Sequence, residues 1–216
     1  MGSLSIILEV MTPANLLDHF GLAVSALSGV LAARGKSLDL FGVLVLALVT
    51  ALGGGSVRDG LLGNGAVAWL RSPEFFATVC ITALIAFVAC RKWEPPAPLF
   101  QVADALALCS FAVAGTRKGL VLGLAPSVSI TLGVITGVVG GIIRDILIGN
   151  VPMVFRKGTY FYATAGLFGG LVYTLLRGPV GDERAVWIAV TSAIILRLGA
   201  IRYRLSLPVF QSDDSH

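Results

Sequence analysis

The chain alternates between long apolar runs and short polar segments. Seven runs, each apolar over about 17–20 residues, fall at about 16–33, 40–57, 74–90, 100–116, 127–144, 159–176 and 185–203. A helix needs about 20 apolar residues to cross the hydrocarbon core of a bilayer. The pattern therefore predicts an all-α membrane protein with seven transmembrane helices. The polar tail, 205–216, is too short to fold by itself.

Composition supports this class and excludes others. Apolar residues make up 56% of the 216 residues and charged residues only 13%, which is typical of polytopic membrane proteins. The short connections leave no room for a large soluble domain. The net charge of +4 is small and scattered, so we expect basic residues at a membrane surface and no nucleic-acid partner.

A polar motif recurs at the end of two apolar runs. GGGSVRDGLLGN (Gly53–Asn64) returns as VGGIIRDILIGN (Val139–Asn150), and the same offset aligns Asp18 with Asp104 and Thr50 with Thr136. Each copy covers three spans, and an odd number inverts the second copy relative to the first. We therefore predict two inverted repeats, about 14–92 and about 99–178, and an added seventh helix at about 184–204. Together they form a single transmembrane domain over 1–204.

The glycines of the motif have two interpretations. They can kink or unwind the helix, which would expose backbone carbonyls to a cation pathway, or they can let two helices pack closely. Duplication at symmetry-related positions favours the pathway. The predicted pathway residues are Gly53, Gly54, Gly55, Gly140 and Gly141, with the nearby polar residues Thr50, Thr136 and Ser56.

The charged residues of the motif are Arg58-Asp59 and Arg144-Asp145. They can edge a pore, or they can form ion pairs that lock the two helices together; we favour the lock. Adjacent residues diverge by about 100° on a helix, so Asp145 or Asp104 is as good a partner for Arg58 as Asp59. Asp104 and its repeat mate Asp18 can attract cations at the two mouths, although a favourable helix dipole explains them slightly better.

Arg117 and Lys118 close the fourth span, where the first repeat has Leu31-Ala32. Basic residues at a span end usually extend to lipid headgroups, and we favour that reading. They are also candidates for contact with a lipid phosphate, or for a charge that feels the membrane potential. Arg197, inside the last span, is similar.

Catalytic and metal-binding patterns are absent from the sequence. His19 is a lone histidine, and the three cysteines fall within or beside apolar runs without metal-ligand spacing. Neither a catalytic triad nor a phosphate-binding loop is visible. We therefore expect no enzyme activity, no metal and no cofactor.

The distribution of Lys and Arg predicts the orientation. One side carries Arg34, Lys36, Arg91, Lys92, Arg156, Lys157, Arg202 and Arg204, and the other carries Arg71, Arg117, Lys118, Arg177 and Arg184. The positive-inside rule then places the C-terminus in the cytoplasm and the N-terminus outside.

The duplicated glycine/Arg-Asp motif, together with Asn150-Val-Pro-Met-Val-Phe155, resembles the TRIC family of trimeric intracellular cation channels, in a prokaryotic form. The resemblance runs from about Asp18 to Arg204. It implies seven helices, a homotrimer in the cell inner membrane, and one potassium-permeable pore per protomer lined by the second and fifth helices. In animal members a basic cluster on the fourth helix is linked to voltage and lipid response. Arg117-Lys118 does not reproduce that cluster.

Two functions remain after this resemblance. Inverted repeats with interrupted helices suit channels and transporters alike, and the same prokaryotic domain has been labelled a glycine transporter. The polar groups near the glycines suit partly hydrated potassium or sodium ions, and no further charged pair is visible that would hold both ends of an amino acid. We therefore predict a monovalent cation channel, with bound lipid as a candidate component, and keep a transporter of a small solute such as glycine as the alternative.

Overall fold

The computed structural model describes residues 13–63, 65–96, 98–156 and 161–205. All the regular elements in this part of the chain are helical. They are α2 (Pro13–Ala33), α3 (Leu40–Leu62), α4 (Ala68–Arg71), α5 (Pro73–Lys92), α6 (Pro98–Val121), α7 (Pro126–Leu147), the 3-10 turn η1 (Met153–Phe155), α8 (Tyr162–Leu176) and α9 (Asp182–Tyr203). Asn64, Lys157 and the predicted tail from residue 206 lie outside the described residues.

Seven of these helices correspond to the seven predicted spans. Among the described residues, six are long and apolar enough to cross a membrane, and α8 is a shorter apolar helix of 15 residues. Local signals set their ends. Asp39 accepts a hydrogen bond from the Gly42 N–H at 2.7 Å at the start of α3, and α3 ends at Gly63 with a left-handed φ of 62°. Gly149, the repeat mate of Gly63, has φ 70° just after α7.

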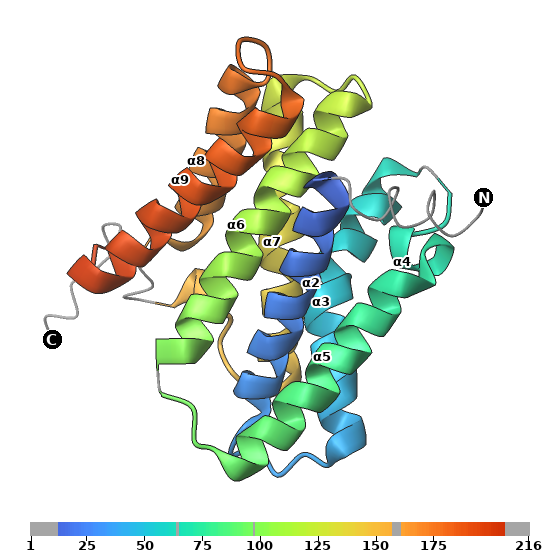
Figure 1. Cartoon of the computed structure of the whole chain (residues 1–216), viewed down its shortest axis with the longest axis vertical. Coiled ribbons are helices and arrows are strands. Elements are labelled where there is room, and N and C mark those ends of the chain that lie inside the picture. Colours follow the sequence, from blue (N-terminus) through green and yellow to red (C-terminus); the bar gives the residue numbers. More distant parts are fainter. Residues whose placement is uncertain (1–12, 64, 97, 157–160, 206–216) are drawn as a thin grey trace, which may run out of the picture.

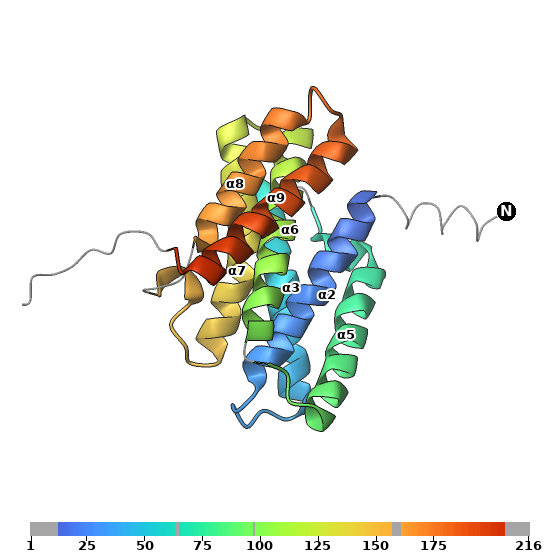
Figure 2. The same cartoon turned by 60° about the vertical axis from the view of Figure 1, so that its left-hand side comes forward.

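The helices form two inverted sets of three. Helices α2, α3 and α5 make the first set, and α6, α7 and α8 make the second; α2 and α6 run in opposite directions (Figure 1). The sets meet where α2 packs on α6 and α3 packs on α7. Helix α9 has no counterpart and lies against α8 and α6 on the outside of the second set (Figure 2). This arrangement confirms the predicted fold class.

Small residues fill the contacts between helices. Ala26, Ala47, Ala83, Ala105 and Ala112 are fully buried, and they allow the close approach typical of membrane helices. Large apolar side chains point outward instead, including Phe41, Leu61, Ile85, Leu175 and Ile195. This inside-out distribution is expected where lipid, not water, surrounds the protein.

Candidate functional site

Helices α3 and α7 touch backbone to backbone at the duplicated glycines. A β-carbon on Gly54 would collide with the carbonyl oxygen of Thr136, and one on Gly140 would collide with the carbonyl oxygen of Thr50. The two collisions are related by the repeat, since Gly54 matches Gly140 and Thr50 matches Thr136. The pseudo-symmetry of the fold therefore passes through this crossing, which only glycine permits.

The helices do not unwind at the glycines. Both α3 and α7 remain α-helical through the motif, so the carbonyls that an unwound segment would expose stay in the helical hydrogen-bond ladder. For Gly54 and Gly140 the geometry is that of the close-packing interpretation. Gly53 follows the same pattern, because its β-carbon would lie 3.2 Å from Cδ1 of Ile143 on the opposite helix.

The two threonines at the crossing are buried and matched. Thr50 and Thr136 each donate a hydroxyl hydrogen bond of 2.6 Å to the carbonyl four residues earlier, on Leu46 and Leu132. Ser25 of α2 donates to the Thr50 carbonyl at 3.2 Å. The threonine hydroxyls therefore have their hydrogens committed inside the helix and keep only lone pairs to offer a cation.

At one end of the molecule, which we call the Lys118 end, Asp59 collects three donors. Its Oδ1 accepts from Arg58 Nε and from Lys118 Nζ, both at 2.7 Å, and its Oδ2 accepts from the Ala68 N–H at 2.9 Å. The last bond ties the short helix α4 to the end of α3. Arg58 thus pairs with its own neighbour, and the partners considered across the repeat, Asp104 and Asp145, are not the ones observed.

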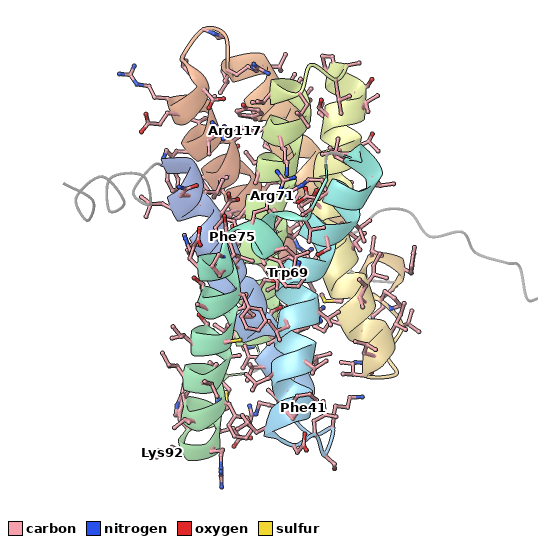
Figure 3. All side chains as sticks on the ribbon, turned by 90° about the vertical axis from the view of Figure 1, so that its right-hand side faces the viewer. Phe41, Trp69, Arg71, Phe75, Lys92 and Arg117 are labelled. Atoms are coloured by element: carbon pink, nitrogen blue, oxygen red, sulfur yellow. The ribbon has the colours of Figure 1, made fainter. Side chains whose placement is uncertain are left out.

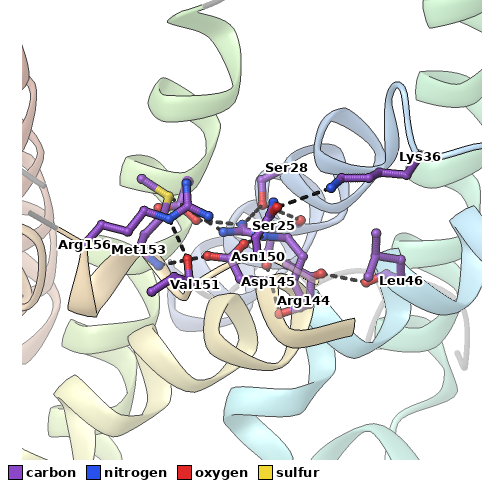
Figure 4. Close-up of polar contacts among 12 residues, drawn as sticks. Ser25, Ser28, Lys36, Leu46, Arg144, Asp145, Asn150, Val151, Met153 and Arg156 are labelled. Atoms are coloured by element: carbon purple, nitrogen blue, oxygen red, sulfur yellow. Dashed lines mark hydrogen bonds and ion pairs between the residues drawn. The ribbon is translucent and has the colours of Figure 1, made fainter. Parts of the chain in front are cut away.

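At the opposite end, which we call the Arg144 end, the same motif is fully buried. Arg144 Nε donates to Asp145 Oδ1 at 2.9 Å, and its Nη1 donates to the Ser28 hydroxyl at 3.1 Å (Figure 4). The same Nη1 also donates to Asp104 Oδ1 at 2.7 Å. Asp145 Oδ2 accepts from the Met153 N–H at 2.9 Å, which holds η1 as Asp59 holds α4. Phe100 lies under the guanidinium, with Cζ 4.8 Å from the ring centre. Each motif aspartate therefore fixes a short helical cap over its own end.

The two ends differ in openness. At the Lys118 end a cavity of about 70 Å³ runs from Asp18 and Trp69 down to Gly55 and Thr136, beside the glycine crossing. A neighbouring cavity of about 200 Å³ shares Asp18, Arg58 and Ala68 with it and adds Arg117 and Lys118. At the Arg144 end, Arg144 has no exposed surface and Asp145 only 1%, so this end of the motif is packed shut.

Trp69 lines the smaller cavity. Its indole N–H donates to the Ser56 hydroxyl at 3.0 Å, and Ser56 donates to the Leu52 carbonyl at 2.8 Å. Phe75 lines the same cavity, and Figure 3 shows it close to Trp69. Ser56 therefore anchors the cap formed by α4.

Arg117 contacts protein in this structure. It pairs with Asp182 at the start of α9 at 2.7 Å, and Asp182 also accepts from the Tyr173 hydroxyl at 2.5 Å. These bonds join α6, α8 and α9 at the Lys118 end. Figure 3 places Arg117 at the end of the molecule opposite Lys92.

Some residues of the site were not predicted from the sequence. Ser28, Trp69 and Asp182 belong to no motif, and Ser28 aligns with Ala114 in the second repeat, so the symmetry gave no signal for it. For Met153 a signal existed, because it lies shortly after the second motif, as α4 does after the first. Gly141 was predicted, and its β-carbon would lie 3.0 Å from the Tyr162 hydroxyl.

The sequence of the chain is similar to that of several membrane proteins. A family model described as "Glycine transporter" matches residues 15–92 and again 101–178, one match for each repeat. A UPF0126 membrane protein of Vibrio cholerae is 42% identical over 197 residues, which cover 90% of this chain and 82% of that protein. The UPF0126 inner membrane protein YadS of Escherichia coli K12 is 40% identical over 202 residues, covering 92% and 97%.

Solved structures agree with these matches. A TRIC trimeric intracellular cation channel orthologue from Rhodobacter sphaeroides superposes with a TM-score of 0.83 at 32% identity, covering 89% of this chain and 98% of that one. A prokaryotic TRIC channel crystallised in 0.5 M KCl gives a TM-score of 0.82 at 29% identity, covering 90% and 98%. The relatives are channels and membrane proteins, not enzymes. The chain therefore belongs to the family that this model and the UPF0126 proteins share with the prokaryotic TRIC cation channels.

Proposed function

We propose that the protein is a potassium-permeable channel for monovalent cations, a homotrimer with one pore in each protomer. The observation that carries the proposal is the cavity of about 70 Å³ that reaches Thr136 beside the glycine crossing, inside a domain of apolar helices long enough to cross a membrane. Polar walls inside such a domain are costly unless they serve a pathway. The relatives described as trimeric cation channels support the same conclusion.

In this proposal the structure is a closed state, and opening requires α3 and α7 to separate. The contact of Gly54 with Gly140 obstructs the path in the middle. Asp59, which is paired with Lys118, holds α4 over the cavities at the Lys118 end. The buried ion pairs of Arg144 obstruct the path at the Arg144 end. Asp18 attracts cations into the cavity, while Arg58 and Lys118 oppose them there.

We place the protein in the inner membrane, as the name of the relative YadS states for that protein, with the N-terminus outside and the C-terminus in the cytoplasm. The loop between α2 and α3 carries Arg34 and Lys36, and the end of α5 carries Arg91 and Lys92. All four lie at the Arg144 end. The positive-inside rule then turns the Arg144 end to the cytoplasm and the Lys118 end outward.

Flux into liposomes tests the proposed function. Purified protein in potassium-loaded liposomes should release potassium down its gradient and should take up no radiolabelled glycine. Glycine uptake that saturates, without potassium release, would contradict the channel. Light scattering in detergent should give the mass of three chains, and a monomer mass would remove the trimer from the proposal.

Removing the charge of Lys118 should raise potassium flux. Lys118→Gln removes a positive charge from the lining of the cavity of about 200 Å³. It also loosens α4, because Asp59 loses one of its three hydrogen-bond donors. We expect potassium flux to increase about three- to tenfold, since one nearby charge changes the free energy of a cation in the cavity by about 1 kcal/mol. Arg184→Gln is the matched control, since Arg184 is exposed at the same end of the molecule. Equal flux in Lys118→Gln, Arg184→Gln and the parent would argue against a path past Lys118.

One observation favours the alternative, a transporter of a small zwitterion. The cavity of about 200 Å³ is lined by Asp18 and by the three basic residues Arg58, Arg117 and Lys118. Charges of both signs around one cavity are what an amino acid requires, and the sequence alone did not reveal this pairing. The glycine arm of the liposome experiment decides between the two functions.

A further inference from the structure

Arg197 is a buried arginine with unused hydrogen-bond donors. It lies in α9 with 1% of its surface exposed, and its Nε and Nη1 have no hydrogen-bond partner in the described part of the chain. Its guanidinium stacks over Tyr162, with Cζ 4.9 Å from the ring centre. A buried guanidinium normally has its donors paired, so this arginine is poised for a partner that it does not hold here.

Asp104 is a buried carboxylate with one unused oxygen. Its Oδ1 accepts from Arg144 Nη1 at 2.7 Å, whereas its Oδ2 is buried and has no partner among the described residues. The Tyr162 hydroxyl and Asp104 Oδ1 lie 3.0 Å and 3.7 Å from the position that a β-carbon on Gly141 would take, so the two groups converge on one point. Tyr162 lies near both groups, because its ring is under the Arg197 guanidinium and its hydroxyl is near Asp104. Arg144 thus binds Asp104, and a second buried arginine stacks on the tyrosine next to that carboxylate.

The two arginines lie on helices with different roles. Arg144 is on α7, which moves away from α3 in the proposed opening, while Arg197 is on α9, which packs on α8 and α6. When α7 moves away, Asp104 would become a buried charge without a partner, which is strongly unfavourable. Pairing with Arg197 would remove the cost of leaving Asp104 unpaired. Two discrete pairings of one group are the kind of bistable element on which gating depends.

We propose that Arg197 is a positioning residue for channel opening, which takes over Asp104 from Arg144 when α7 moves. The seventh helix would then do more than cover the second repeat, because it would supply the ion pair of the open state. The inference rests on the proposed channel function.

The test compares Arg197→Met with the parent protein in potassium-loaded liposomes and in thermal melts. We expect flux to fall at least about fivefold, the lower end of coupling between sites in a two-state protein. The melting temperature should stay the same or rise, because methionine removes an unpaired charge from the closed state. Arg197→Lys should restore most of the flux. Arg202→Met, an exposed arginine on the same helix, should match the parent in both measurements.

Other results would overturn the inference. Parent-like flux in Arg197→Met would show that opening does not need this arginine. Reduced flux with a lower melting temperature, not rescued by Arg197→Lys, would show a structural role only. Absence of flux in the parent would refute the channel instead.

Discussion

Replacing Gly54 with alanine is expected to destabilise the protein severely. The added methyl group would occupy the position of the Thr136 carbonyl oxygen, and a backbone atom cannot rotate away as a side chain can. Inserting a methyl group into a close-packed contact costs about 1–3 kcal/mol and occasionally more, and we expect the upper part of that range. Equilibrium unfolding in mixed detergent micelles measures the change.

The chain offers two controls for this experiment. Gly140→Ala is the symmetry-related change, which meets the Thr50 carbonyl, and it should cost about as much. Gly60→Ala lies on the same helix with open space at its β-carbon, so it should stabilise the helix by about 0.5–1 kcal/mol. Parent-like stability of both Gly54→Ala and Gly140→Ala would refute the backbone contact at the crossing.

Replacing Arg144 with alanine should be the most damaging change at the charged motif. It leaves Asp104 and Asp145 as buried carboxylates without their shared cation. Breaking a buried ion pair from one side costs about 3–5 kcal/mol. The same unfolding measurement applies, and adding Asp104→Asn to Arg144→Ala should recover part of the lost stability because it removes one unpaired charge.

The repeat supplies the comparison for this prediction. Arg58→Ala removes the equivalent residue, but Asp59 keeps Lys118 and the Ala68 N–H, so we expect a loss below about 2 kcal/mol. Equal losses at the two positions would contradict the difference in packing between the Lys118 end and the Arg144 end.

The fold could be predicted from the sequence because two of its signals are coarse. Apolar runs long enough for a bilayer mark the spans, and the fixed spacing from Asp59 to Asp145 marks the repeat. Three spans per repeat then require the inversion. The helix ends were less accessible: α3 continues past its apolar run to Leu62, because the motif charges are paired inside the protein.

The site was only partly predictable because its decisive contacts are not symmetric. Lys118 aligns with Ala32 and Ser28 with Ala114, so neither Lys118 with Asp59 nor Ser28 with Arg144 has a mate in the other repeat. Arg58 pairs with its neighbour Asp59 because its side chain is long enough to span the angle of about 100° between adjacent residues on a helix. The angle alone did not reveal this pair. By sequence the glycines fitted both kinking and close packing, and the close packing appears only in the structure, where Gly54 meets the Thr136 carbonyl.

Single-channel recording in planar bilayers tests the central claim most directly. Purified protein in symmetric potassium chloride should give discrete unitary currents that reverse at the potassium equilibrium potential when a cation gradient is applied. Lys118→Gln should raise these currents or the fraction of time spent open, and Arg197→Met should lower the fraction of time spent open. Bilayers that contain the protein and show no unitary current under any potassium gradient would contradict the channel.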